Sequence, residues 1–521
     1  MGLRTLPVFA GGQLQGVSGV RPARLDELTL AELRAGIRSG RFSAVSLAKD
    51  YLTRIEEVDR NGPHLNSVIE INPDALAIAR ELDRERKAGK DRGPLHGIPV
   101  LIKDNLDTHD RMSTTAGSLA LAGSIAAEDA FVVQRLREAG AVILGKTNLS
   151  EWANFRSAHS TSGWSGRGGL TRNPYALDRN PSGSSSGSAV AVAASLCAVA
   201  VGTETDGSIL SPSSYNGIVG IKPTVGLVSR SGIIPISHSQ DTAGPMARTV
   251  ADAAILLGCM VGQDANDAAT GPSAGNSHAD YTAFLDPAGL RGARIGVARK
   301  CFGDYAEANK LMEAAIVEMK QLGAVIIDPA DLPSHGKFDE QEFQVLLYEF
   351  KADLNAYLAG LGPNVPVHSL QEVIEFNHRH RDREMPWFAQ ETMLKAQEKG
   401  PLTEPGYRKA LEDCRRLSRE EGIDAVMAEH RLDALVAPTT GPAHVTDLVY
   451  GDRDTGGSTT PAAVAGYPSI TVPAGQVAGL PMGLSFFGRA WSEPKLIKLA
   501  FAFERATRHR KPPTFQPTIQ S

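Results

Sequence analysis

Apolar residues recur at helical spacing along the first ninety residues of the chain. Between residues 29 and 59 they include Leu30 and Leu33, three residues apart, as expected on one face of a helix. The pattern continues over residues 72–88, where charged residues lie between the apolar ones. We therefore expect residues 1–90 to form a mainly helical segment that packs on the rest of the protein.

Short apolar runs alternate with helical segments after residue 90. Residues 98–102 form such a run, which ends at Lys103 as expected of a buried strand, and residues 141–145 form a second one. The segment between them, residues 130–140, has helical spacing. Alternating strands and helices are typical of α/β folds, so we expect a large mixed β-sheet covered on both faces by helices.

The longest apolar run of the sequence lies between Ala189 and Val201 and contains 13 residues. Its small apolar residues predict a buried helix. A membrane-spanning helix needs about 20 residues, so this run is too short to cross a bilayer. We therefore expect no membrane partner.

The pattern changes after residue 264, where long polar helices follow two strand candidates. Strand candidates in the second half are residues 294–298, 324–328, 434–437, 469–473 and 483–487, and a terminal helix is expected over residues 493–508. We expect the helical segment 1–90, a core over 91–265, a mainly helical cap or insertion over 266–430, and strands and a helix over 431–521 that complete the domain of the core.

The balance of charges excludes several classes of partner. Lys and Arg number 54 against 59 Asp and Glu, a formal net charge of −5, which offers no basic surface for nucleic acid. The four cysteines are widely spaced without a Cys-x-x-Cys pair, so neither a disulfide framework nor a zinc site is expected. Residues 1–20 have no basic segment followed by an apolar one, so we expect a cytoplasmic protein unless an exported form has already lost its signal.

The stretch from Asn180 to Ser188, rich in serine and glycine, is the most unusual part of the sequence, and the segment Gly202 to Ser208 follows it after a run of small apolar residues. A flexible linker is one interpretation. However, the first stretch runs directly into the apolar residues 189–201, where flexibility would be out of place. A loop of this composition directs several backbone N–H groups at one point, as an oxyanion hole requires.

A serine nucleophile also needs a base. Ser208 is not in a Gly-x-Ser-x-Gly motif, because the five residues read Asp206-Gly-Ser-Ile-Leu210. The nearest downstream histidine, His238, is not part of a recognisable Ser-His-Asp order. Lys103 is the candidate base if its side chain is buried, because burial lowers the pKa of a lysine. The alternative is that its side chain reaches solvent and has no catalytic role.

Several motifs, in one order along the chain, resemble the amidase signature family of serine hydrolases. They are Leu95-His-Gly-Ile-Pro-Val-Leu-Ile-Lys-Asp-Asn105, Gly145-Lys-Thr-Asn-Leu-Ser-Glu-Trp-Ala153, the stretch from Pro181, the segment Gly202 to Pro212, Gly220-Ile-Lys-Pro-Thr-Val-Gly-Leu-Val-Ser-Arg230 and Asp241-Thr-Ala-Gly-Pro-Met-Ala-Arg248. Together they cover most of residues 90–260, and the terminal strands fit the family fold.

The resemblance implies a triad of serine, cis-serine and lysine. In the family the bridging serine lies in a cis peptide 24 positions before the nucleophile, which selects Ser184 and Ser208, with Lys103 as the base. Residues 182–187 read Ser-Gly-Ser-Ser-Ser-Gly where the family usually has Gly-Gly-Ser-Ser-Gly-Gly. Because of this departure, either of the next two serines stays open as the bridge.

The resemblance also implies that the backbone N–H groups of Thr205, Asp206, Gly207 and Ser208 hold the oxyanion. The acyl-enzyme formed on Ser208 would then be hydrolysed by water, and no metal or organic cofactor is expected. Asp206 is either a catalytic acid or a residue that shapes the loop, and its place beside the nucleophile favours the second role.

The expected function is hydrolysis of a carboxamide to a carboxylic acid and ammonia. Segments 202–209 and 226–248 are most similar to family members that remove ammonia from C-terminally amidated peptides. Many members have an arginine two positions after the nucleophile, where this chain has Leu210, so we expect a small molecule or short peptide with a neutral primary amide. The amidase chain of a tRNA-dependent amidotransferase and a non-catalytic binding protein on the same fold are the alternatives.

Overall fold

A mixed β-sheet forms the centre of the protein in a computed structural model, which describes residues 24–519. Eleven strands are hydrogen-bonded in a single sheet. In spatial order they are β1 (Val68–Ile71), β3 (Val142–Thr147), β2 (Pro99–Lys103), β6 (Val199–Glu204), β8 (Thr242–Ala247), β7 (Val219–Lys222), β12 (Ser469–Val477), β13 (Leu480–Phe487), β11 (Ala434–Pro438), β9 (Arg294–Val297) and β10 (Val325–Ile327).

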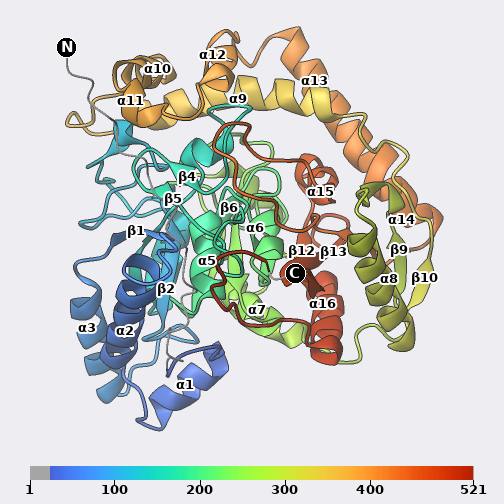
Figure 1. Ribbon diagram of the computed structural model, residues 1–521, viewed down its shortest axis with the longest axis horizontal. Helices are drawn as coiled ribbons and strands as arrows, with labels where there is room; N and C mark the ends of the chain where they lie inside the picture. The colour runs from blue at the N-terminus through green and yellow to red at the C-terminus, as the bar shows by residue number, and fades with distance from the viewer. Residues whose placement is uncertain (1–23, 520–521) are drawn as a thin grey trace, which may run out of the picture.

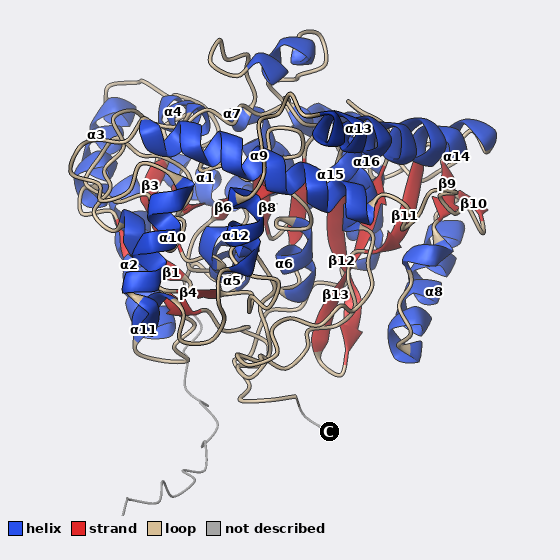
Figure 2. Cartoon of the chain, turned by 90° about the horizontal axis from the view of Figure 1, so that it is seen from above, coloured by secondary structure: helices blue, strands red, loops and turns tan. Residues whose placement is uncertain are grey.

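Helices flank this sheet (Figures 1 and 2), as the alternation of patterns predicts. They are α1 (Leu30–Arg38), α2 (Ala44–Arg54), α3 (Ala75–Lys87), α4 (Phe131–Glu138), α5 (Ser186–Ala193), α6 (Leu210–Tyr215), α7 (Val250–Met260), α8 (Ala306–Gln321), α9 (Asp339–Ala359), α10 (Leu370–Arg379), α11 (Arg381–Glu384), α12 (Glu391–Gln397), α13 (Pro405–Arg415), α14 (Asp424–Glu429), α15 (Thr459–Ala465) and α16 (Glu493–Thr507). A separate hairpin consists of β4 (Trp164–Ser165) and β5 (Gly169–Leu170).

The pairing of three parallel strands brings two distant parts of the chain together. Strand β2 lies between β3 and β6 and is parallel to both, with Ile102 opposite Val201. Since the carboxyl ends of parallel strands meet at one edge of a sheet, Lys103 at the end of β2 lies beside Thr203 near the end of β6. All five residues of β2 are buried.

The apolar run at residues 189–201 differs from the prediction. Helix α5 ends at Ala193, Ser195 adopts a left-handed conformation with φ +56°, and β6 begins at Val199. The prediction of one helix through Val201 is therefore wrong in its second half. A continuous apolar run has no periodicity that would distinguish a buried helix from a buried strand. The pattern therefore does not indicate where the helix ends and the strand begins.

Helices α9 to α13 form an arc along one side of the molecule (Figure 1). Leu347, Phe350 and Leu354 of α9 pack in an apolar cluster with Trp152 and Ile236 of the core. The strands predicted at residues 294–298 and 324–328 are β9 and β10, which belong to one end of the central sheet. The helices of this stretch thus cover the core, while its two strands extend it.

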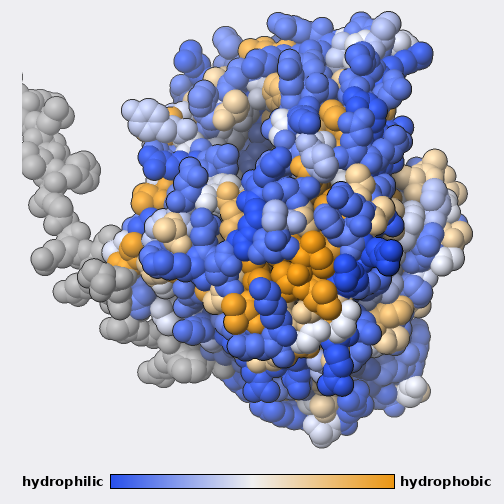
Figure 3. Space-filling view, turned by 90° about the vertical axis from the view of Figure 1, so that its right-hand side faces the viewer, coloured by the Kyte–Doolittle hydropathy of each residue, from blue (hydrophilic) through white to orange (hydrophobic). Residues whose placement is uncertain are grey.

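The side of the molecule near β10 is mainly hydrophilic, with an apolar patch near its centre (Figure 3). On the last strand of the sheet Val325 is 45 % exposed, and on the neighbouring helix α8 Val317 is 48 % exposed. Within residues 24–519 no helix is long and apolar enough to span a membrane. Residues 1–20, on which the expectation about a signal sequence rests, lie outside the described residues.

Candidate active site

Lys103 is the last residue of β2, and its side chain is completely buried. Its Nζ lies 2.8 Å from Ser184 Oγ, 2.8 Å from Thr203 Oγ1 and 3.2 Å from the Thr203 carbonyl oxygen. Burial disfavours the ammonium form and lowers the pKa of Lys103 to about 7, although Asp241 and Glu204 oppose this shift. Of the two environments considered for this lysine, the structure has the buried one.

Ser184 lies in the turn that leads into α5, and its peptide bond with Gly183 is cis, as the resemblance implies. Hydrogen bonds distinguish it from the two serines that follow. The hydroxyl of Ser184 contacts Lys103 Nζ, whereas the hydroxyls of Ser185 and Ser186 donate to backbone carbonyl oxygens at 3.0 and 2.6 Å. Of the three serines, Ser184 is the one that contacts the lysine.

Ser208 follows Gly207 in the loop between β6 and α6, and 8 % of its surface is exposed. Its carbonyl oxygen accepts a hydrogen bond from the Ser185 N–H at 3.1 Å, so this loop lies against the turn that holds Ser184. Gly207 has a φ of +75°, which glycine adopts without strain. A Cβ atom at this position would lie 2.8 Å from Ser211 Oγ.

The candidate nucleophile, Ser208, is the last of four successive residues whose backbone N–H groups are of interest, which are Thr205, Asp206, Gly207 and Ser208. None of them donates a hydrogen bond within the described part of the chain, whereas the next two N–H groups both donate to the buried Glu204 carboxylate, at 2.8 and 3.0 Å. Unpaired donors beside a serine suit the negative oxygen that forms when an amide carbonyl is attacked.

Neighbouring side chains hold this loop in place. Thr460, in the first turn of α15, donates from Oγ1 to Asp206 Oδ2 at 2.7 Å, and Thr205 Oγ1 donates to Asp241 Oδ1 at 2.5 Å. Burial raises the pKa of Asp206, while hydrogen bonds from Thr460 and Thr459 oppose the shift. These contacts favour the loop-shaping role of Asp206 over that of a catalytic acid.

The partners of Lys103 Nζ indicate how a proton moves. A neutral amine has two N–H donors and one lone pair. The Thr203 carbonyl oxygen only accepts, and Thr203 Oγ1 accepts from Asn105 Nδ2 at 3.0 Å as well as from the lysine. With both N–H groups of the neutral lysine directed at Thr203, its lone pair faces the Ser184 hydroxyl. The arrangement suits transfer of a proton from Ser184 to Lys103.

A cavity of about 640 Å³ lies beside the two serine-bearing loops. Its wall includes Ser182, Ser211, Thr459 and Thr460, and Glu342 of α9. Ligand pockets in proteins commonly have a volume of several hundred Å³. This cavity therefore has room for a short peptide amide.

A second cavity, of about 210 Å³, has Thr203, Thr205 and Asp241 in its wall, together with His238 and Asp353. It thus reaches Thr203, which contacts Lys103 Nζ, and Thr205, which begins the loop that carries Ser208. Its volume is below the usual range for a bound organic ligand.

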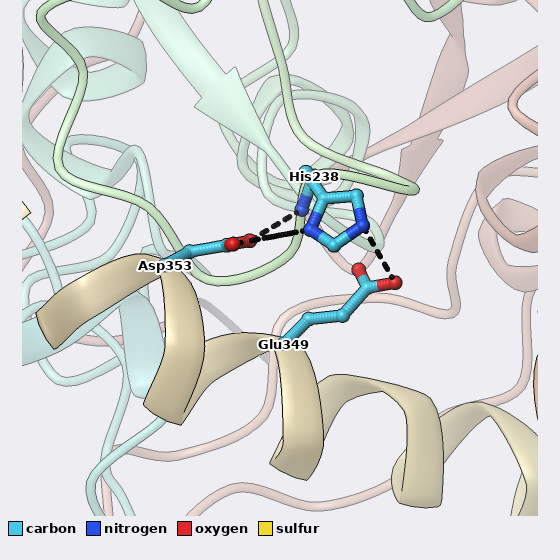
Figure 4. A group of neighbouring side chains, drawn as sticks. All are labelled: His238, Glu349 and Asp353. Atoms are coloured by element: carbon cyan, nitrogen blue, oxygen red, sulfur yellow. Dashed lines mark hydrogen bonds and ion pairs between the residues drawn. The ribbon is translucent and has the colours of Figure 1, made fainter. Parts of the chain in front are cut away.

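His238 also belongs to a group of side chains that joins the core to α9 (Figure 4). Its Nδ1 lies 2.8 Å from Asp353 Oδ2, and its Nε2 lies 3.3 Å from Glu349 Oε1. These ligand-type atoms lie within 4.8 Å of one another, as in a metal site. However, the Glu349 carboxylate also accepts hydrogen bonds from Ser237, Ser239 and Tyr407, so we interpret the group as an ionic contact.

Sequence analysis missed residues that support the candidate site. Thr203 and Glu204 lie inside a segment that it singled out, but neither was assigned a role. Gln240 directly precedes the motif that begins at Asp241, but it was assigned no role, and Glu342 has no distinctive motif around it. Both lie far along the chain from Lys103. Only the fold brings them near.

Comparison with known proteins agrees with this geometry. Residues 46–497 match the protein family described as Amidase, so the chain belongs to the amidase family and is an amide-hydrolysing enzyme. A probable amidase of Arabidopsis thaliana is 45 % identical over 500 residues, which cover 94 % of this chain and 92 % of the plant protein.

Solved structures show which kinds of amidase this chain is most similar to among those compared. The native peptide amidase of Stenotrophomonas maltophilia is 54 % identical, with a TM-score of 0.91 and coverage of 95 % of this chain and 100 % of that one. A complex of peptide amidase with the competitive inhibitor chymostatin has the same TM-score and 55 % identity, covering 94 % of this chain and 99 % of that one. A glutamyl-tRNA(Gln) amidotransferase chain from Thermotoga maritima is 27 % identical with a TM-score of 0.70, covering 96 % of this chain and 100 % of that one.

Proposed function

We propose that the protein hydrolyses the C-terminal amide of short peptides, or another neutral primary amide, to a carboxylic acid and ammonia. In this proposal Ser208 is the nucleophile, Ser184 the bridging residue and Lys103 the base. The observation that carries it is the buried lysine, whose Nζ lies 2.8 Å from Ser184 Oγ and whose pKa of about 7 leaves much of it neutral near pH 7.

The reaction follows from proton transfer between these three groups. Lys103 takes a proton from Ser184, which takes one from Ser208 as that oxygen attacks the amide carbon. The protons then return along the same path to the leaving nitrogen, which departs as ammonia. The N–H groups from Thr205 to Ser208 stabilise the oxyanion. Water attacks the acyl group on Ser208, and the same relay accepts its proton.

The residue two positions after the candidate nucleophile supports a neutral amide rather than an anionic substrate. Leu210, at the position where many family members have an arginine, is completely buried at the start of α6 and offers no charge to a carboxylate. The similarity to peptide amidases, at 54 and 55 % identity, supports amidated peptides in particular. Loops outside the core set specificity in such folds, so the preferred acyl group has to be determined by assay.

Two other functions predict different results. The amidase chain of an amidotransferase should copurify with a partner chain and need ATP for the coupled reaction. One such relative, a glutamyl-tRNA(Gln) amidotransferase chain of Symbiobacterium thermophilum, is 34 % identical over 500 residues, covering 93 % of this chain and 98 % of that protein. A binding protein on the same fold should release no ammonia. The higher identity to peptide amidases favours hydrolysis by the isolated chain.

The test is ammonia release by the purified chain from an amidated dipeptide, free glutamine and malonamate, with Ser208→Ala as the control. We expect the highest kcat/KM for the amidated dipeptide and no turnover by the variant. A tenfold advantage of glutamine or malonamate, about 1.4 kcal/mol in transition-state binding, would contradict the specificity but leave the triad standing. Absence of ammonia from every amide would contradict the proposed function as a whole.

A further inference from the structure

One buried acid in the wall of the larger cavity takes no part in the proposed reaction. Glu342, in the first turn of α9, is 7 % exposed and lines the cavity beside the serine loops. Its Oε1 accepts a hydrogen bond from Gln240 Nε2 at 2.8 Å. Within the described residues its Oε2 accepts none. Oε2 is not one of the fully buried side-chain oxygens without a partner, so it is reached from the cavity, where a bound ligand can donate a hydrogen bond to it.

The position of Glu342 relative to the candidate oxyanion hole is fixed by one side chain. The amide nitrogen of Gln240 that donates to Glu342 also donates to the Thr205 carbonyl oxygen, at 3.2 Å. Thr205 begins the run of unpaired N–H groups that ends at Ser208. Glu342 is thus joined through a single residue to the loop where a substrate carbonyl would lie.

The neighbourhood of Glu342 is acidic. Asp206 raises the pKa of Glu342, adding to the larger effect of burial, and Asp206 Oδ1 is itself buried without a hydrogen-bond partner in the described part of the chain. Asp339, on the same turn of α9, also lines the cavity. The cations of this wall, Lys300 and Arg453, are exposed, so water screens them more than it screens the buried acid.

We propose that Glu342 is the acceptor for the protonated amino group of the substrate, so that the preferred substrates are short peptide amides with a free N-terminus. This inference rests on the proposed function, because it assigns a subsite within the same cavity. An ammonium group supplies N–H donors and a single positive charge, and this charge opposes the burial and the repulsion from Asp206 that raise the pKa of Glu342, so the bound cation favours the carboxylate form. A charge-assisted hydrogen bond of this kind is stronger than a neutral one.

The arrangement fits an ammonium better than a divalent metal ion. Within residues 24–519, the only group of three or more possible ligands within 4.8 Å of one another is the group of His238, and Glu342 does not belong to it. A metal ion bound by protein groups alone needs several oxygen ligands around one point. An ammonium needs one strong acceptor and the hydroxyl groups that this wall offers at Thr459 and Thr460.

The test compares three dipeptide amides that differ only at the N-terminus: a free amine, an N-acetyl group, and a hydroxyl in place of the amine. We expect wild-type kcat/KM to be at least tenfold higher for the free amine than for either of the others. In Glu342→Gln, which keeps the acceptor for Gln240, the ratio of free to acetylated amide should fall at least fivefold. The matched control is Glu340→Gln, an exposed acid two residues away that does not line the cavity, where the ratio should stay within twofold of wild type.

Equal rates on the three amides, or an unchanged ratio in a folded Glu342→Gln, would overturn the inference while leaving amide hydrolysis intact. The wild-type comparison decides the question even if the variant does not fold. Hydrolysis of none of the three would overturn the proposed function and this inference with it. If adding EDTA abolished the preference for the free amine, Glu342 would instead be a ligand of a metal ion.

Discussion

At the scale of single residues, the environment of Lys103 decides what the candidate site can do. The strand that carries it is buried along its whole length, and Thr203 supplies two acceptors to its Nζ. A lysine in water is almost wholly charged at pH 7 because its ordinary pKa is about 10.4. Here burial disfavours the ammonium form and so makes a neutral base available near pH 7.

Substitution within the proposed triad should remove turnover without additive losses. Ser208→Ala, Ser184→Ala and Lys103→Met should each lower kcat by at least about a thousandfold, and the double variant of Ser208 and Lys103 should be no worse than the single ones, because members of one proton relay fail together. Single-turnover ammonia release checks this, with circular dichroism as the control for folding. Near wild-type ammonia release by Lys103→Met would rule out the lysine as the base.

The pH dependence of the reaction should report the pKa of Lys103. On an N-acetylated amide, which has no titrating amine of its own, kcat/KM should rise about tenfold per pH unit below pH 7 and level off above it, since only the neutral lysine accepts a proton. Because the Asp241 carboxylate raises this pKa, Asp241→Asn should move the rising limb to lower pH. A profile that falls steadily from about pH 6 to 9 would argue against a lysine base.

At the scale of elements, close packing of α5 fixes the position of Ser184. Every residue of this helix is buried, and its glycine approaches two backbone segments. A Cβ atom on Gly187 would lie 2.3 Å from the Ser67 carbonyl oxygen and 2.5 Å from the Asn148 carbonyl oxygen. The turn that carries Ser184 is therefore held against the strand region around Asn148, and the helix cannot move without shifting backbone.

Gly187→Ala should destabilise the protein by about 1–3 kcal/mol, because the new methyl group has no space and its neighbours are backbone atoms. Unfolding in urea measures this. Gly271→Ala is the matched control, since no atom lies within 4 Å of a Cβ atom there, and we expect its unfolding midpoint to be close to wild type. Equal midpoints for the two variants would show that α5 has room to move.

Helices with a clear period and short apolar runs that end at a charged residue could be predicted from sequence, and elements with neither pattern could not. The strand ending at Lys103 and the terminal helix lie close to where the pattern places them. Strand β8 was missed because it contains Gly244 and Pro245, residues that are unfavourable in strands. Gly244 is nevertheless required there, since a Cβ atom would lie 2.1 Å from the Ile221 carbonyl oxygen.

The residues of the candidate site likewise include some that could be predicted from sequence and some that could not. Lys103, Ser184 and Ser208 could be selected because they lie in motifs that resemble a family. Thr203, which orients the lysine, was visible in one of those motifs, but its role depends on the pairing of β2 with β6. Glu342 lies in an ordinary polar helix, and no local pattern relates it to residues more than a hundred positions earlier.

At the scale of the whole molecule, polar contacts attach the arc of helices α9 to α13 to the core. Buried Glu384 of α11 accepts a hydrogen bond from the Leu119 N–H at 2.6 Å, and His238 contacts Glu349 and Asp353 of α9. Hydrogen bonding to Asp353 raises the pKa of His238. The attachment of α9, and with it the position of Glu342, thus depends partly on a titrating group.

His238→Gln should destabilise the protein more at pH 6 than at pH 9. A raised folded-state pKa means that the contribution of His238 is complete below its ordinary pKa of about 6.5 and is lost as pH rises through the folded value. Because the ring is partly exposed, we expect about 0.5–1 kcal/mol at pH 6, measured by urea unfolding. The control is His378→Gln, on the exposed surface of α10, which should show no such difference. An equal loss in the free energy of unfolding at both pH values in His238→Gln would mean that packing rather than charge is involved.

The order of strands in the sheet has a consequence for biosynthesis. Strands β1, β3, β2, β6, β8 and β7 all come from the first half of the chain and form one contiguous half-sheet, whose edge strand β7 is paired in the finished protein by β12. While the ribosome is still translating the residues before Ser469, that edge has no partner in the nascent chain. Exposed strand edges invite aggregation, so the growing chain should depend on chaperones at this stage and should gain its complete cavity, with Thr459 and Thr460 in the wall, only near the end of translation.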